Sequence, residues 1–269
     1  MANRKDHPIG LYDSKSTPKY IENIDAISQE EINFFHSHGY LAIQELFDFK
    51  TITKAKSEIQ RLISGEAKEF NGIQYEQSDL AKDQPKSVRK LMGFIDHSTH
   101  LSKMAKKTDL INLVGRLMDD SDPLLFQDMA LLKGPYGREK PWHQDAAYFD
   151  LPINTTIIGA WIALDTATKD NGCLHVLPKT HKNGPAEHFH IRDWQLCDTT
   201  IQTSLDVAIP LDPGGCLLWH GLLHHGSPTN NTGATRAALQ FHYKPHSCEN
   251  ITAEERMQYF GGDIRGATC

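Results

Sequence analysis

The sequence predicts a mainly β protein with flanking helices, in which the helices come first and a jelly-roll-like β core follows. Amphipathic helical patterns are confined to the part of the chain before Pro123. After Pro123, short runs of β-forming residues alternate with turns rich in glycine, proline and asparagine. Evenly spaced short strands of this kind are typical of sandwiches and barrels. The runs are 124–133, 157–165, 174–178, 207–209, 216–219 and 236–243.

The N-terminal elements carry boundary signals of their own. Residues 1–25 are polar and interrupted by proline and glycine, which predicts an arm. Ser28 and Glu31 have the spacing of a capping box, so we expect a helix to begin after Ser28. Gly39 is suited to the left-handed conformation that ends many helices, and we therefore expect this helix to stop near His38.

Three further elements are expected before Pro123. A short strand over 40–43 follows the first helix, and residues 51–64 and 108–118 each place apolar side chains on one helical face. Because nothing near residue 120 resembles a linker, we expect one domain over residues 1–269. Its parts are the arm 1–25, a mostly helical flank 26–122, the β core 123–245 and a C-terminal tail 246–269.

Composition argues against several classes of function. The 269 residues include 28 Lys and Arg against 34 Asp and Glu, so no basic excess favours nucleic acid. The apolar runs fall short of the roughly 18–20 residues of a membrane span, and the N-terminus lacks the apolar segment of a secretory signal. The five cysteines are scattered and never form a CxxC pair, which argues against a disulfide scaffold or a zinc ribbon. We therefore expect a cytoplasmic protein. The sequence does not indicate its oligomeric state.

The segment Pro141-Trp-His-Gln-Asp carries the first candidate chemistry. His143 and Asp145 are two residues apart, so on a strand their side chains would point to the same face and offer two ligands to a divalent metal. The 15 histidines of the chain draw attention to metal chemistry, but an isolated HxD pair is common by chance. A third ligand has to come from elsewhere. The distal candidates are His220, His224 and His225.

Arg236 is the second candidate feature. It lies on the predicted strand 236–243 and shares a face with Ala238, Gln240 and His242. A buried arginine needs an anionic partner, and its planar guanidinium is well suited to a carboxylate. Two histidines and one carboxylate leave positions open on Fe(II) for a chelating cosubstrate and O₂.

Four sequence blocks in this order resemble the phytanoyl-CoA dioxygenase family. They are PWHQDAAYF at 141–149, NGCLHVLPKTH at 171–181, HGS at 225–227, and Arg236. The resemblance spans roughly residues 30–245. It implies a double-stranded β-helix core, which is a cupin-like jelly roll, and a non-haem Fe(II)/2-oxoglutarate-dependent oxygenase that consumes O₂.

The resemblance also implies roles for individual residues. The HxD pair and a distal histidine would bind iron, and His225 is favoured because ten positions separate it from Arg236, as in the family. Arg236 and Ser227 would bind the far carboxylate of 2-oxoglutarate. Further cosubstrate contacts are Trp161 and Lys90, and the expected substrate contacts are Gln127, Tyr148 and Phe149. Core packing would explain the three aromatic residues as well, and Lys90 or Gln127 could be ordinary polar groups.

The expected reaction is hydroxylation of a small-molecule metabolite, coupled to decarboxylation of 2-oxoglutarate to succinate and CO₂. An acyl-CoA substrate, desaturation and ring formation stay open. Halogenation is disfavoured, because Asp145 is present where halogenating relatives carry a small residue. A non-catalytic cupin-like metal-binding protein would have no need of Arg236. A zinc hydrolase with two histidines and an aspartate would lack an evident general base.

Overall fold

The structure is a computed structural model that describes residues 7–76, 87–119 and 121–269. Its helices are α1 (Gln29–His38), α2 (Phe49–Ile63), α3 (Thr99–Ala105), α4 (Thr108–Leu117) and α5 (Ala253–Phe260), and the short 3₁₀ helix η3 (Asp145–Tyr148) is important for the site. Its strands are β1 (Tyr20–Asn23), β2 (Tyr40–Glu45), β3 (Ile73–Tyr75), β4 (Val88–Met92), β5 (Pro123–Lys133), β6 (Lys140–His143), β7 (Ile158–Ala163), β8 (Leu174–Val176), β9 (His188–His190), β10 (Trp194–Leu196), β11 (Val207–Ile209), β12 (Cys216–His220), β13 (His225–Ser227) and β14 (Arg236–Pro245).

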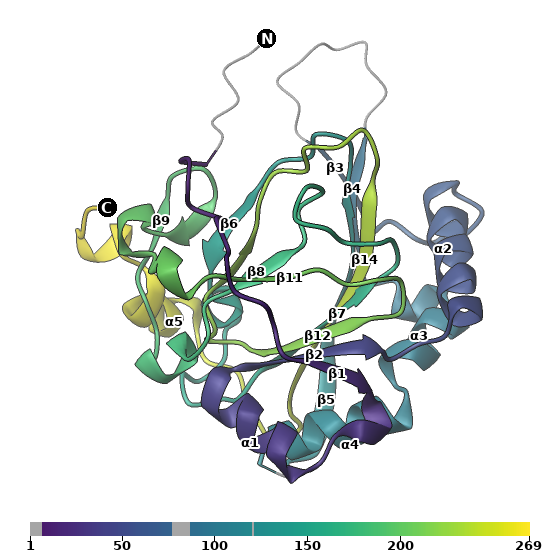
Figure 1. The fold of residues 1–269 in the computed structure, drawn as a ribbon, viewed down its shortest axis with the longest axis horizontal. Helices are drawn as coiled ribbons and strands as arrows, with labels where there is room; N and C mark the ends of the chain where they lie inside the picture. The colour runs from purple at the N-terminus through teal and green to yellow at the C-terminus, as the bar shows by residue number, and fades with distance from the viewer. Residues whose placement is uncertain (1–6, 77–86, 120) are drawn as a thin grey trace.

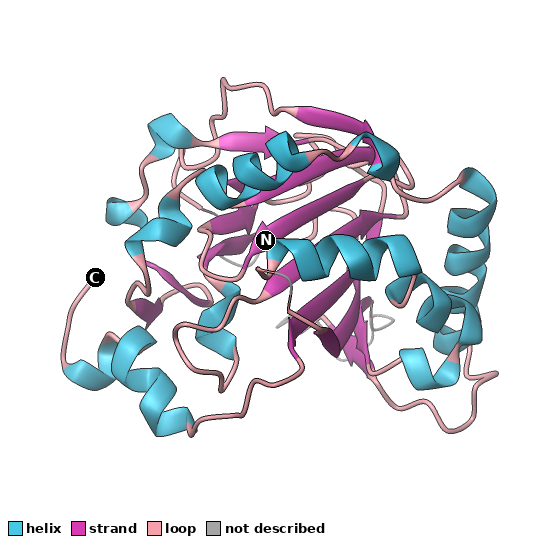
Figure 2. Cartoon of the chain, turned by 90° about the horizontal axis from the view of Figure 1, so that it is seen from below, coloured by secondary structure: helices cyan, strands magenta, loops and turns pink. Residues whose placement is uncertain are grey.

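Two β-sheets face each other, which confirms the mainly β, jelly-roll-like fold class (Figure 1). The larger sheet has the strand order β1-β2-β12-β7-β14-β5-β4-β3, and the smaller one has the order β11-β8-β13-β6. The sheets do not join into a closed barrel. Helices α1 to α4 cover the outer face of the larger sheet, and α5 lies on the other side of the molecule beside β9 (Figures 1 and 2).

Strand β7 explains how this architecture arises from its sequence. Ile158, Ala160 and Ile162 pack toward the helices, whereas Trp161 and Ala163 pack toward the smaller sheet. Because both faces of the strand are buried, its sequence is apolar throughout instead of alternating with polar residues. The inner face of the larger sheet therefore projects toward the space in which the candidate site lies.

The predicted helix boundaries are confirmed for α1. Ser28 and Glu31 form the capping box, and Gly39 takes a left-handed conformation with φ of 86°. Helix α2 begins at Phe49, two residues earlier than predicted, because the Asp48 carboxylate accepts a hydrogen bond from the Thr51 amide. Its buried residues are Ile52, Ala55, Ile59 and Leu62. Helix α4 buries the predicted apolar side chains.

The arm and the flank contain more β structure than the sequence indicated. Strand β1 lies within the predicted arm and pairs in parallel with β2. The predicted helical flank contributes β2, β3 and β4 to the larger sheet, in addition to its helices. Strand β2 confirms the strand predicted over 40–43. Strands β1, β3 and β4 were missed because pairing with distant strands, more than local sequence pattern, stabilises them. The division of the chain into one domain with these parts stays a prediction.

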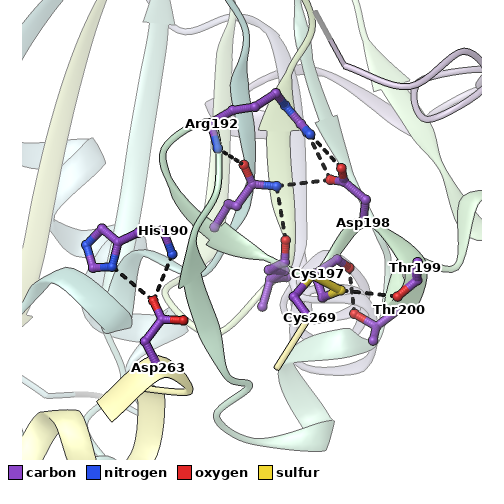
Figure 3. The surroundings of a disulfide bond; sticks show 10 residues. His190, Arg192, Cys197, Asp198, Thr199, Thr200, Asp263 and Cys269 are labelled. Carbon is purple, nitrogen blue, oxygen red and sulfur yellow. Dashed lines mark hydrogen bonds and ion pairs between the residues drawn. A yellow bond between two sulfur atoms is a disulfide. The ribbon is translucent and has the colours of Figure 1, made fainter. Parts of the chain in front are cut away.

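The tail contains helix α5 and a disulfide that the sequence did not predict. Cys197 and Cys269 are joined by a disulfide across 72 positions (Figure 3). Sequence spacing does not reveal which distant cysteines become neighbours. Cys173, Cys216 and Cys248 carry free thiols. No helix in the described ranges is long and apolar enough to span a bilayer.

Candidate active site

A cavity of about 350 Å³ lies between the two sheets. Strands of the larger sheet line it from one side, and strands of the smaller sheet together with η3 line it from the other. All ten residues that the sequence singled out lie on its wall. They are Lys90, Gln127, His143, Asp145, Tyr148, Phe149, Trp161, His225, Ser227 and Arg236.

The three candidate metal ligands converge at one point of this wall. His143 is the last residue of β6 and is the direct cross-strand partner of His225 on β13. We expected Asp145 to lie on the same strand as His143, but it is the first residue of η3. Gln144 remains extended between them, so His143 and Asp145 still project to the same side. One ligand atom from each of the three residues lies within 4.8 Å of the others.

Hydrogen bonds fix the orientation of both histidines. The Nδ1 atom of His143 lies 2.7 Å from the Pro141 carbonyl oxygen, and the Nδ1 atom of His225 lies 3.0 Å from the Leu223 carbonyl oxygen. A carbonyl oxygen only accepts, so Nδ1 carries the proton in both rings. Each Nε2 atom is therefore left with a lone pair, as a metal ligand requires.

Asp145 is held by two side chains that the sequence did not assign to the site. The indole N–H of Trp219 donates to its Oδ2 atom at 2.9 Å, and His242 Nε2 lies 2.9 Å from the same oxygen. The other oxygen, Oδ1, lies 3.4 Å from His143 Nε2. Trp219 and His242 are thus positioned to orient the carboxylate toward the histidines.

The protonation states suit metal binding. Burial and, to a lesser extent, the neighbouring His225 lower the pKa of His143 to about 4, so His143 is neutral near pH 7. Burial raises the pKa of Asp145, but His225 and His242 outweigh this effect and hold that pKa well below its ordinary value. The site therefore offers a neutral imidazole and a carboxylate to a cation.

Gln144 anchors the turn that carries the candidate ligands. Its side-chain amide donates to the carbonyl oxygens of Gly184 and Leu222, at 2.9 and 2.7 Å. Its Oε1 atom accepts a hydrogen bond from the Ala186 amide at 2.8 Å. The residue between the two ligands thus points away from the cavity and ties the turn to two loops.

The opposite part of the cavity wall is cationic. Arg236 is 3% exposed, and within the described part of the chain neither its Nε nor its Nη1 atom has a hydrogen-bond partner. Its guanidinium lies over the ring of Trp161, with Cζ 5.0 Å from the ring centroid. The indole N–H of Trp161 is also buried without a partner. Buried donors without partners are rare, so these groups indicate a binding site for a ligand that carries hydrogen-bond acceptors.

Lys133 is a second cation on this wall, and the sequence reasoning did not assign it to the cosubstrate. It is the last residue of β5 and pairs directly with Arg236 across the sheet. Its ammonium group lies 2.5 Å from the hydroxyl oxygen of Ser227 and 2.5 Å from the Pro228 carbonyl oxygen. Ser227 Oγ also lies 3.5 Å from Nη2 of Arg236.

The remaining predicted contacts surround the rest of the cavity. Lys90 lies on β4, and burial lowers its pKa, as does the charge of Lys140. Gln127 on β5 is the cross-strand partner of His242. Tyr148 donates its hydroxyl hydrogen to the Trp194 carbonyl, and the Phe149 ring lies 5.0 Å from that of His242.

The two alternative distal histidines lie elsewhere. Neither His220 nor His224 lines the cavity in the described part of the chain. The His220 ring lies 5.2 Å from that of His181, and its Nδ1 atom accepts a hydrogen bond from the Leu222 amide. The geometry therefore groups His225, and not these two, with His143 and Asp145.

Comparisons with known proteins agree with this geometry. The family "Phytanoyl-CoA dioxygenase (PhyH)" matches residues 35–238. The peroxisomal phytanoyl-CoA dioxygenase of Bos taurus is 25% identical over 256 residues, covering 89% of this chain and 75% of the relative. A probable phytanoyl-CoA dioxygenase of Caenorhabditis elegans is 26% identical over 270 residues, covering 91% and 84%.

A solved structure shares the fold. The epimerase SnoN, in complex with Fe³⁺, α-ketoglutarate and nogalamycin RO, superposes with a TM-score of 0.70 at 18% identity, covering 84% of this chain and 86% of SnoN. The three gathered ligand atoms fit an iron ion, and the unpartnered donors of Arg236 fit a dicarboxylate. The chain therefore belongs to the phytanoyl-CoA dioxygenase family and is a dioxygenase that uses Fe(II), 2-oxoglutarate and O₂.

Proposed function

We propose that His143, Asp145 and His225 hold the iron, while Arg236 binds the distal carboxylate of 2-oxoglutarate with Ser227 and Trp161 beside it. One observation carries this proposal: a metal-ligand triad and an unpartnered buried guanidinium lie on the same cavity. A zinc hydrolase would use the triad but leave Arg236 without a role. A non-catalytic metal-binding cupin would do the same.

We propose hydroxylation of a small-molecule metabolite as the reaction. When bound, iron and 2-oxoglutarate supply the oxidising chemistry, in which O₂ is consumed and 2-oxoglutarate becomes succinate and CO₂. The residues of this chain bind and orient the reactants. The hydrogen-bonded histidines and Asp145 keep the metal position fixed, and the buried ring of Trp219, 5.2 Å from that of His225, excludes water beside it.

We propose that the substrate binds in the part of the cavity lined by Lys90, Gln127, Tyr148 and Phe149. A volume of about 350 Å³ is near the lower end of the roughly 300–1,000 Å³ of small-molecule sites, and the cosubstrate takes part of it. This size supports a small free metabolite. It accommodates only the acyl end of a CoA thioester.

The charges on the cavity wall also favour a free metabolite. An acyl-CoA substrate needs uncompensated cations for its phosphates. The Nε atoms of Arg89 and Arg138 lie 3.8 and 3.7 Å from the carboxylate oxygens of Glu76. The Nζ atom of Lys140 lies 2.9 Å from Oδ2 of Asp193. These three cations already have carboxylate partners, so they offer little to a phosphate.

Hydroxylation is proposed over other oxidative outcomes on the chemistry of the triad. Asp145 occupies the position that a halide would need, which disfavours halogenation. SnoN is an epimerase with the same fold, so fold alone does not select hydroxylation over epimerisation, desaturation or ring formation. Product analysis by mass spectrometry separates these outcomes, because hydroxylation alone adds one oxygen atom.

The substrate is best identified by a metabolite screen. Purified iron-loaded protein is incubated with 2-oxoglutarate, air and one candidate metabolite, and succinate release is measured with and without that metabolite. Stimulation by a small free metabolite, with a product heavier by one oxygen atom, supports the proposal. Stimulation only by acyl-CoA thioesters contradicts the proposed substrate class, and the absence of O₂-dependent succinate with every candidate contradicts the proposed site.

The cytoplasmic location stays a prediction. The disulfide between Cys197 and Cys269 weighs against a reducing compartment, and curated relatives include peroxisomal enzymes. Fractionation of the source cells, followed by immunoblotting, tests it.

A further inference from the structure

Lys133 and Arg236 place two cations side by side on the cavity wall. The two residues are direct cross-strand partners on β5 and β14, so their side chains leave the sheet on the same face. Like charges in this arrangement repel each other and destabilise the sheet. The partners of Lys133 are oxygen atoms of Ser227 and Pro228, and among the described residues neither cation forms an ion pair with a carboxylate. The pair therefore lacks the anion that would neutralise it.

The ammonium group of Lys133 is held in a defined position. Its three hydrogens have three acceptors, namely Ser227 Oγ at 2.5 Å, the Ser227 carbonyl oxygen at 3.2 Å and the Pro228 carbonyl oxygen at 2.5 Å. The stem of the side chain fits against Gly172, where an added Cβ would come within 3.1 Å of Nζ and 2.5 Å of the Pro228 carbonyl oxygen. The structure thus keeps a charged end group inside the cavity at a fixed place.

The hydroxyl group of Ser227 is engaged on both sides. Its Oγ lies 2.8 Å from the carbonyl oxygen of Gly172, which only accepts, so the hydroxyl hydrogen goes to Gly172. Its oxygen accepts from Lys133. In this arrangement Ser227 has no hydrogen left for a carboxylate. Its role is to seat Lys133 beside Arg236, and the attraction for an anion comes from the two cations.

The lowered pKa values of both groups are those expected of a site that binds an anion. Burial lowers the pKa of Lys133 well below its ordinary value, and the charge of Arg236 lowers it further. Burial also lowers the pKa of Arg236, to about 10. A bound carboxylate would oppose these effects in both residues.

We propose that Lys133 is a positioning residue for the cosubstrate, and that Lys133 and Arg236, joined by Ser227, form a two-cation site for the distal carboxylate of 2-oxoglutarate. This inference rests on the proposed role of Arg236. It assigns part of the attraction for the carboxylate to a residue outside the four sequence blocks that carry the family resemblance.

The test compares two ligands on several variants. 2-Oxoglutarate and 2-oxopentanoate have the same carbon chain and the same metal-chelating end, but 2-oxopentanoate lacks the distal carboxylate. Their binding to Fe(II)-loaded protein is measured without O₂ by titration calorimetry. The variants are Lys133→Met, which removes charge and donors, Lys133→Gln, which removes charge but keeps a donor, and Lys133→Arg, which keeps the charge.

The proposal predicts a specific pattern. Lys133→Met and Lys133→Gln weaken 2-oxoglutarate binding about tenfold to hundredfold and change 2-oxopentanoate binding less than twofold, whereas Lys133→Arg recovers most of the loss. Lys140→Met is the matched control. It removes a lysine that lines the same cavity from the smaller sheet and is already neutralised by Asp193, so the ratio of the two affinities is expected to stay near that of the wild type.

Two results would overturn the proposal. Equal weakening of both ligands in the neutral variants would mean that Lys133 supports the fold of the site and not the carboxylate. Unchanged 2-oxoglutarate binding would mean that Arg236 suffices. If Lys133→Met does not fold, Lys133→Gln decides. A wild-type protein that binds neither ligand contradicts the proposed function instead, so the two failures are distinguishable.

Discussion

His242 Nε2 lies 2.9 Å from Oδ2 of Asp145, although the two residues are 97 positions apart. The indole N–H of Trp219 donates to the same oxygen at 2.9 Å. Oδ2 therefore has two neighbouring hydrogen-bond partners, while Oδ1 faces His143. Partners of this kind orient a metal-binding carboxylate and adjust its affinity.

The first prediction concerns this contact. His242→Leu removes one donor to Asp145, so iron affinity should fall roughly 10- to 100-fold, as measured by competition with a coloured chelator. His242→Gln, which can place an amide N–H near the former Nε2, should recover part of the loss. His224→Leu is the control, because His224 is a half-buried neighbour of His225 that does not line the cavity. Equal losses in His242→Leu and His224→Leu would refute the orienting role.

The second prediction concerns Arg236. Arg236→Ala should raise the 2-oxoglutarate concentration for half-maximal succinate formation roughly 100-fold, because the distal carboxylate loses charge-assisted hydrogen bonds. The melting temperature should stay the same or rise, because a buried cation without an anionic partner is removed. A half-saturation value equal to that of the wild type would move the carboxylate site elsewhere, with Lys90 as the next candidate.

The third prediction concerns the disulfide shown in Figure 3. Cys197 and Cys269 close a loop of 72 positions, for which chain entropy gives a stabilisation of about 4 kcal/mol. Cys269→Ser should therefore lower the melting temperature by roughly 5–15 °C, measured by calorimetry. A reductant should lower the wild-type value in the same way and leave the variant unchanged. Cys248→Ser is the control, since Cys248 is a free thiol. If the reductant has no effect on the wild type, the two cysteines are not joined in solution.

Local sequence was sufficient for much of the site. His143, Asp145, His225 and Arg236 were found because short spacings and a motif order place them, and the alternation of strand side chains predicted which face of β14 looks inward. The capping box of α1 was predictable for the same reason, since all its atoms lie within one helical turn.

The residues that were missed depend on distant contacts. Trp219 reaches Asp145 across 74 positions, and Lys133 reaches Ser227 across 94. Each of these side chains also fits an ordinary strand position, so the sequence gives no sign of its partner. Strand β1 was missed in the same way, because its pairing with β2 gives it its structure.

The most direct test of the central hypothesis is O₂-dependent conversion of 2-oxoglutarate to succinate by the purified iron-loaded protein, compared with Asp145→Ala. The wild type should form succinate in air and none without O₂. Asp145→Ala should form almost none, because only two strong protein ligands remain for iron, and its circular dichroism spectrum should match that of the wild type. Succinate formation by Asp145→Ala at the wild-type rate, or none by the wild type with any candidate substrate, would contradict the assignment of the triad.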